Sequence, residues 1–215
     1  MIPRRRGQLS LFSHRRSPMN IYLVFAHPSN KSFTREVFDE FIRGLKEAGH
    51  SVEIGDLYQM DFKADMDLEE YTRETGTDPE APLTEDVLHE HAKINAADAL
   101  AFIYPVWWSD CPAKLKGWFD RVLTYGYAYT YEDGEHSTSK IEIQKALVIC
   151  PAGHPNDYLE KTGIAASMRR VMLNDRLLGV GVKSAQMEIL GGMMYNDPDV
   201  RKWNLETAYR LGRNF

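Results

Sequence analysis

Runs of apolar, β-forming residues recur along the chain and predict its strands. The first run, residues 21–26, reads Ile-Tyr-Leu-Val-Phe-Ala and does not alternate with polar positions. A continuous apolar run is typical of a strand buried on both faces of a parallel sheet. We predict further strands at residues 51–57, 99–104, 146–151 and 182–190.

Between these runs, apolar residues recur every three or four positions, which is the period of a helix packed on one side. The period begins after Ser32 and continues to Gly49, a residue type that commonly ends helices. The segment 60–82 is acidic and poor in periodicity, and predicts a long surface excursion with a short helix at residues 68–73. Further helices are predicted at residues 85–96, 112–124, 163–178 and 197–213.

Strands that alternate with helices predict an α/β fold with helices on both faces of a parallel sheet. Five strands suit the flavodoxin-like three-layer sandwich, whose strand order is 2-1-3-4-5. In that order the ligand crevice lies between the first and third strands. The loops at residues 27–33 and 105–111 should therefore converge on one ligand.

The loop after the first strand carries His27 and opens a helix, where backbone N–H groups and the helix dipole attract phosphate. Ser32 and Thr34 offer hydroxyls that can cap this helix or bind pyrophosphate. The glycines of a Rossmann fingerprint or a P-loop are absent, which argues against a Rossmann NAD site and an NTPase. By itself the loop is equally consistent with a capped helix start.

The loop after the third strand contains Pro105, Val106 and the adjacent indoles Trp107 and Trp108. This arrangement favours a flat ligand, and a flavin ring is the obvious candidate, with backbone N–H groups bonding to its N5 and O4 atoms. The alternative is that both tryptophans belong to the core.

Two other segments carry candidate residues. Tyr129 and Tyr131 lie on the same side of an extended chain and predict a dimer contact, a substrate wall or a half-buried strand face. After the fourth strand, Gly153 allows close approach of the backbone to a ring, and Tyr158 offers a phenol.

Composition narrows the classes of function. The 215 residues fit one domain, and the formal charge of −5 gives no reason to expect nucleic acid. No apolar run approaches bilayer length, so we expect a cytoplasmic protein. The Arg-rich segment 1–18 is predicted to be a disordered extension to a domain at 19–215. Three interpretations are open for it: an incorrectly assigned translation start or a tag, an arm that contacts a partner subunit, and an organellar presequence.

Several other features predict ordinary structure. His89, Glu90 and His91 lie in a polar helical stretch that we interpret as a solvated face without metal. Cys111 and Cys150 have no metal or CxxC spacing and are expected to be reduced, half-buried thiols.

The chain resembles the NAD(P)H:quinone oxidoreductases of the DT-diaphorase type. The most specific match is residues 105–122, with Pro-x-x-Trp followed by Pro-Ala-x-Leu-Lys-Gly-Trp-Phe-Asp-Arg-Val. Supporting matches are residues 26–27 with 32–33, 56–58 and 128–131.

The resemblance implies a homodimer that binds FAD and passes hydride from NAD(P)H to a quinone in a ping-pong reaction. His27, Ser32, Phe33 and Thr34 would lie against the flavin phosphates, and residues 105–108 with Ala152 and Gly153 would border the ring system. Trp108 would form the floor of the substrate pocket, Tyr129 and Tyr131 would wall it from the partner subunit, and Asp120 would reach the adenine of the partner's FAD.

The family tyrosine that stabilises charge at flavin N1 and O2 corresponds to Tyr158, but its histidine partner is replaced by the segment 163–166, Gly-Ile-Ala-Ala. His154 and Lys161 are the candidates to replace it. Ser109 stands where the family has a bulky aromatic residue, and the excursion at 60–82 also departs from the mammalian pattern, so FMN is the alternative cofactor.

Other activities remain open at this point: reduction of nitro or azo compounds, a flavin-binding regulatory subunit of a potassium-efflux system, and one-electron transfer. The sequence does not distinguish NADH from NADPH or name the physiological acceptor.

Overall fold

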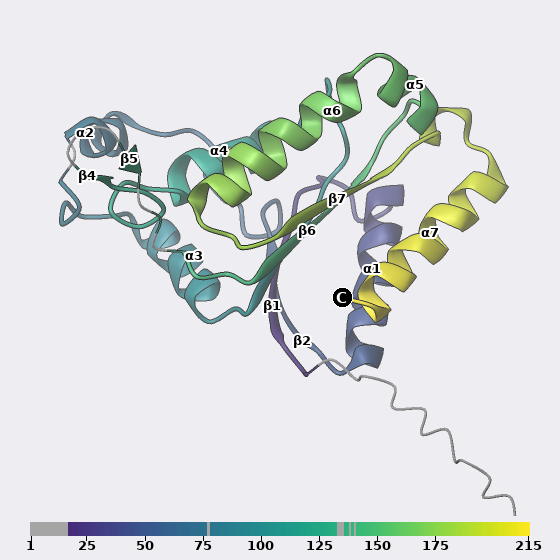
Figure 1. The fold of residues 1–215 in the computed structure, drawn as a ribbon, viewed down its shortest axis with the longest axis horizontal. Helices are drawn as coiled ribbons and strands as arrows, with labels where there is room; N and C mark the ends of the chain where they lie inside the picture. Colours follow the sequence, from purple (N-terminus) through teal and green to yellow (C-terminus); the bar gives the residue numbers. More distant parts are fainter. Residues whose placement is uncertain (1–16, 77, 133–135, 138, 140) are drawn as a thin grey trace, which may run out of the picture.

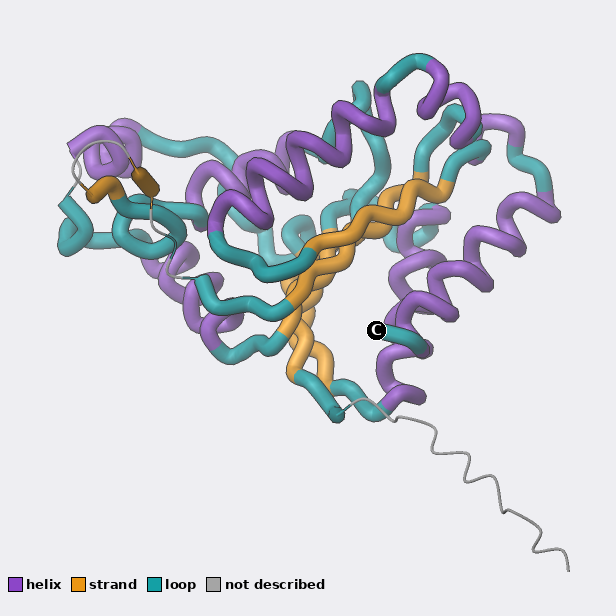
Figure 2. Tube along the Cα trace, viewed as in Figure 1, coloured by secondary structure: helices purple, strands orange, loops and turns teal. Residues whose placement is uncertain are grey.

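A five-stranded parallel sheet with the order β2-β1-β3-β6-β7 runs through the middle of the protein (Figure 2). This confirms the predicted flavodoxin-like order, and each strand lies within three residues of its predicted limits. The strands are β1 (Asn20–Phe25), β2 (Ser51–Asp56), β3 (Ala99–Ile103), β6 (Lys145–Pro151) and β7 (Ala185–Leu190).

The computed structural model describes residues 17–76, 78–132, 136–137, 139 and 141–215 (Figure 1). The predictions for the Arg-rich extension lie outside the described residues up to position 16. Within the described ranges, no helix is long and apolar enough to cross a membrane.

Helices cover both faces of the sheet. On one side lie α1 (Phe33–Ala48) and α7 (Pro198–Arg213); on the other lie α3 (Glu85–Asn95), α4 (Ala113–Val122) and α6 (Ile164–Arg169) (Figure 1). Alternate residues of β1 serve the two sides: Leu23 packs with α1 and α7, whereas Tyr22 and Val24 pack with α3 and α4. Both faces of this strand are therefore core, as its unbroken apolar run predicts.

The first helix begins and ends as predicted. Ser32 caps it by accepting a hydrogen bond from the Arg35 N–H at 3.1 Å, and Gly49 closes it with a φ of 92°. Helices α1 and α7 cross closely at Gly212, where a Cβ atom would lie 2.2 Å from the Phe41 carbonyl oxygen.

The helix predicted at residues 163–178 is only partly regular. After α6, residues Arg170–Leu177 form π-helical turns, and a 3₁₀ turn follows at Leu178–Val180. Met168, Met172 and Leu177 are all buried, and the spacing of five between the last two needs the wider turn to keep both on one face.

Four short elements were not predicted in their observed form. Helix α2 (Leu68–Gly76) extends beyond the predicted residues 68–73, and α5 (Asn156–Lys161) follows β6. Strands β4 (Tyr131–Glu132) and β5 (His136–Ser137) pair antiparallel and lie beside α2 at one end of the molecule (Figure 1).

The prediction that residues 89–91 form a solvated face is wrong for two of the three. His89 is exposed, but Glu90 is fully buried and His91 is 7 % exposed. The Glu90 carboxylate accepts hydrogen bonds from the Tyr22 hydroxyl and, at 2.6 Å, from Trp118 Nε1. These buried donors need an acceptor, and Glu90 supplies it, so a polar residue occupies a core position.

His91 and Glu90 also hold their neighbours. His91 Nε2 donates to the Val122 carbonyl at 2.8 Å, and its ring stacks on Tyr127 at 3.6 Å between centroids. Lys93 lies 2.7 Å from the second Glu90 oxygen and balances its charge.

Replacing Glu90 with alanine should lower the free energy of unfolding by about 3 kcal/mol, because two buried donors lose their acceptor. Urea unfolding measures this. Glu85→Ala is the matched control, since Glu85 lies in the same helix with its side chain 89 % exposed. Equal losses in the two variants would contradict the structural role of Glu90.

Candidate active site

The loops after β1, β3 and β6 meet at the carboxyl edge of the sheet. The Val106 N–H donates to the Pro151 carbonyl at 2.8 Å, which joins the second loop to the third. The rings of His27 and Trp107 lie 6.1 Å apart between centroids, which places the first loop beside the second. The sheet order therefore brings these loops together, as predicted for the segments at 27–33 and 105–111.

The β1 loop is folded on itself by short-range hydrogen bonds. His27 Nδ1 accepts from the Ser29 N–H at 2.9 Å, and the Ser32 hydroxyl donates to the Ser29 carbonyl at 3.0 Å. Burial lowers the pKa of His27, so its ring is neutral near pH 7. The loop thus offers a neutral ring and backbone groups to a ligand.

At the start of α1 the predicted phosphate-binding residues have different surroundings. The Ser32 hydroxyl caps the helix, Phe33 is half-buried, and Thr34 is only 3 % exposed. The side chain of Thr34 is therefore part of the core, and its backbone is what remains for a phosphate. Arg201 lies 4.6 Å from the centre of the Phe33 ring, and its guanidinium pairs at 2.9 Å with the carboxylate of Glu36 in the first turn of this helix.

The two indoles stand on a tight turn. Trp107 and Asp110 exchange backbone hydrogen bonds of 3.0 and 3.1 Å, and the two residues between them, Trp108 and Ser109, have φ values of 50° and 64°. Two successive positive φ values are the pattern of a type I′ turn, which is unfavourable for residues other than Gly, Asn and Asp. Such strain clusters at functional sites.

Both indoles are accessible to a ligand. Trp107 is 42 % exposed, and Trp108 at the tip of the turn is completely exposed. The alternative that they belong to the core is therefore wrong. The N–H groups of Val106 and Trp107 bind carbonyl oxygens of the protein itself, so the expected bonds to flavin N5 and O4 would have to come from other backbone groups of the loop.

An ion pair between the largely buried Arg176 and the half-exposed Asp110 holds the turn in place. Arg176 binds both oxygens of Asp110, each at 2.9 Å, and its hydrogen bonds outweigh the effect of burial and lower the pKa of that carboxyl. Sequence analysis missed Arg176, because its partner lies 66 positions away. Next to the pair, burial raises the pKa of Cys111 to about 12, so this thiol is protonated at neutral pH.

The β6 loop is supported by the segment that follows β7. Met193 and Met194 donate their N–H groups to the carbonyls of Ala152 and Gly153, each at 3.1 Å. Ala152 is buried and Gly153 is exposed, while Met194 and Tyr195 are 57 % and 67 % exposed beside them. The sequence analysis did not name these two side chains as site residues. Their place just after the fifth predicted strand, whose carboxyl end lies at the same edge of the sheet, could have indicated them.

Tyr158 lies on α5 and is 45 % exposed. Its ring packs on His154 at 4.5 Å between centroids, tilted by 30°. The other candidate partner, Lys161, lies 3.7 Å from the Asp157 carboxylate instead. Of the two, only His154 is shown in contact with the tyrosine.

The remaining predicted residues form a second group. Asp120, Tyr129 and Tyr131 line a groove of about 610 Å³ together with Arg176. Asp120 pairs with Lys116, and Tyr131 is 55 % exposed. Arg176 thus contacts both the indole turn and this groove, but the structure does not bring the three residues to His27 or Tyr158.

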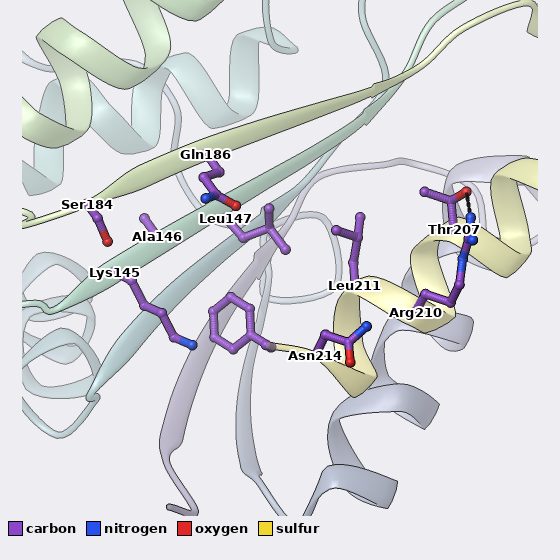
Figure 3. A pocket seen from close by; sticks show the side chains of 10 residues that line it. Lys145, Ala146, Leu147, Ser184, Gln186, Thr207, Arg210, Leu211 and Asn214 are labelled. Carbon is purple, nitrogen blue, oxygen red and sulfur yellow. Dashed lines mark hydrogen bonds between the residues drawn. The ribbon is translucent and has the colours of Figure 1, made fainter. Parts of the chain in front are cut away.

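A further hollow, of about 600 Å³, lies at the opposite edge of the sheet (Figure 3). Lys145, Ser184 and Gln186 line it from the sheet, and Arg210 and Leu211 from α7. It receives no predicted site residue, and it lies at the amino ends of β6 and β7, away from the edge where ligands bind in such sheets.

Comparison with known proteins agrees with this geometry. A family model described as the flavodoxin-like fold matches residues 19–210. The solved NAD(P)H:quinone oxidoreductase from Methanothermobacter marburgensis is 60 % identical, with a TM-score of 0.88 over 92 % of this chain and 97 % of that one.

Two curated proteins extend the similarity. A protein named uncharacterized NAD(P)H oxidoreductase, from Haemophilus influenzae, is 31 % identical over 88 % of this chain and 92 % of its own length. NAD(P)H dehydrogenase [quinone] 1 of Cavia porcellus is 28 % identical over 83 % of this chain and 70 % of its own.

Proposed function

The chain belongs to the family with the flavodoxin-like fold, and from this premise we propose that it is a flavin-dependent NAD(P)H:quinone oxidoreductase. One observation carries the proposal: Trp108 is completely exposed on a strained turn at the ligand-binding edge of the sheet. In the free chain the strained turn and the exposed indole contribute no stabilising contact. A flat ligand would bury the indole and so give the strained turn a purpose.

The residues at this edge fit a flavin. The start of α1 presents backbone N–H groups and the positive end of the helix dipole to a phosphate. A Cβ atom on Gly153 would meet only Met194, at 3.7 Å, so the protein leaves open space over this backbone for a ring. Trp107 supplies the aromatic edge on the other side.

When bound, a flavin accepts a hydride from NAD(P)H and delivers it to a quinone. The protein would contribute orientation and charge stabilisation. Trp108 would lie under the substrate ring and exclude water from the reacting face. The Tyr158 hydroxyl would donate to the negative charge that develops on the pyrimidine side of the cofactor.

We propose that His154 takes the place of the missing family histidine. Its ring packs on that of Tyr158, tilted, at 4.5 Å between centroids, so it can hold the phenol in place. The more distant Lys161 is paired with Asp157 and is the weaker candidate.

We also propose a homodimer. Asp120, Tyr129 and Tyr131 lie in their own groove, and a second copy would carry them to the indole turn of the first. We propose FAD as the cofactor, in which case Asp120 and Lys116 would receive the adenine half of the partner's FAD. FMN is the alternative, and a cytoplasmic location stays a prediction.

The experiment is to purify the protein, release and chromatograph its chromophore, and assay the loaded protein with NADH or NADPH and a quinone. FAD and turnover support the proposal in full, whereas FMN with turnover removes the role given to Asp120. A flavin-loaded protein that oxidises neither nicotinamide with any quinone would refute it.

A further inference from the structure

The end of helix α2 holds the tyrosine segment by its backbone. The Glu74 carboxylate accepts the Tyr125 N–H at 2.8 Å, and the Arg73 guanidinium donates to the Tyr125 carbonyl from two nitrogens, each at 3.3 Å. Both backbone polar groups of one residue, Tyr125, are therefore bound by two adjacent side chains from another part of the chain.

These two side chains are buried and paired with each other. Their exposed fractions are 7 % for Arg73 and 15 % for Glu74, and the charged groups lie 2.6 Å apart. Arg73 also donates to the carbonyls of Ala81 at 3.0 Å and Pro79 at 3.4 Å. One guanidinium thus ties the acidic excursion to the tyrosine segment, and its burial makes the arrangement rigid.

Close packing at Gly126 adds a contact independent of the charges. Gly126 has a φ of 86°, and a Cβ atom there would lie 2.6 Å from Pro79 Cβ. Only glycine allows the chain to turn here against the excursion.

Helix α2 also contacts the aromatic side chains of the tyrosine segment. The Tyr129 hydroxyl donates to Glu74 at 3.4 Å. The rings of Tyr125, Tyr129 and Tyr131 contact one another, with centroids 5.6 to 6.1 Å apart. Because Tyr125 and Tyr129 are held by α2, the orientation of the more exposed Tyr131 is set by its contacts with them.

We propose that Arg73 and Glu74 are positioning residues that hold the tyrosine row (Tyr125, Tyr129 and Tyr131) as a rigid wall and thereby set which quinones are accepted. This inference rests on the proposed function, in which Tyr129 and Tyr131 wall the substrate pocket. It assigns a role to the excursion that contains α2, and the role requires no contact between α2 and the substrate.

The test is Glu74→Ala, assayed with benzoquinone as a small acceptor and menadione as a larger one. We expect the KM for benzoquinone to rise about 5- to 10-fold with kcat within about 2-fold, because the wall contributes to binding and not to hydride transfer. The preference between the two acceptors should change by about 5-fold, while bound flavin stays unchanged.

Two further variants make the result specific. Glu69→Ala is the matched control, since Glu69 is an exposed glutamate of the same helix, and it should keep wild-type KM values. Tyr129→Phe removes only the hydroxyl that binds Glu74, so it should raise KM in the same direction, and its effect should be smaller when Glu74 is already alanine. It also keeps the test open if Glu74→Ala does not fold.

A readout without turnover separates this inference from the proposed function. Chymotrypsin should cleave native Glu74→Ala near residues 125–131 about 10-fold faster than wild type, because the segment loses its anchors. Unchanged cleavage and unchanged KM values in Glu74→Ala would overturn the inference. A wild-type protein that reduces no quinone would overturn the proposed function. Faster cleavage of Glu74→Ala would then still show that Glu74 holds the tyrosine row in place.

Discussion

Replacing Trp108 with alanine should lower kcat/KM for a quinone roughly 10- to 100-fold, because burial of an indole against a flat substrate contributes about 1.5–3 kcal/mol. The free energy of unfolding should change by less than about 0.5 kcal/mol, since the side chain is completely exposed and packs on nothing in the free chain. Steady-state kinetics and urea unfolding of the same preparation measure both quantities.

The control is Trp203→Ala. Trp203 is an exposed tryptophan of α7, with 60 % of its surface accessible, and its ring lies 4.8 Å from the Arg210 guanidinium. This variant should retain wild-type kinetics. If Trp108→Ala turned over quinone as wild type does, Trp108 would be removed from the site, and the strained turn would need another explanation.

Tyr158→Phe should lower kcat about 100-fold and leave the KM for NAD(P)H within a few-fold, because a lost hydrogen-bond donor to developing negative charge acts mainly on the transition state. The ring is kept, so its packing on His154 should be kept as well. Rapid-mixing measurement of cofactor reduction by NAD(P)H isolates the step on which this donor would act.

For this prediction Tyr71→Phe is the control, because Tyr71 is an exposed tyrosine on α2 with no part in the proposed site. Replacing His154 should reproduce part of the Tyr158→Phe effect if the histidine holds the phenol. A Tyr158→Phe enzyme with wild-type kcat would show that charge at the cofactor is stabilised by other groups.

The sheet was predictable because its signal is local and continuous. Strand β1 is buried on both faces, so nearly every side chain in the run is apolar, and Ser32 and Gly49 mark the helix that follows. The loops could also be placed, because strand order alone brings the carboxyl ends together. The exposure of Trp108 agrees with a ligand-facing interpretation of the indole pair.

What escaped prediction depends on partners distant in the chain. The polar stretch around Glu90 predicts a surface residue, yet Tyr22 and Trp118 make Glu90 a hydrogen-bond acceptor in the core. Arg176 and Asp110 are likewise separated by 66 positions. The periodicity of the sequence does not reveal such pairs, because each of these charged residues, taken alone, is typical of a solvent-exposed position.

The excursion shows the same limit. Its acidic composition predicts a surface loop, and most of its residues are exposed. The role of Arg73 and Glu74 becomes visible only when Tyr125 is placed against them, more than fifty positions later.

The central claim is that this fold carries a flavin used for two-electron transfer to quinones. Its most direct test is an anaerobic titration of the flavin-loaded protein, followed by visible absorbance. One equivalent of NADH or NADPH should bleach the flavin in a single two-electron step, and one equivalent of quinone should restore it. A flavin that neither nicotinamide reduces, or that is reduced in separate one-electron steps, would contradict the account.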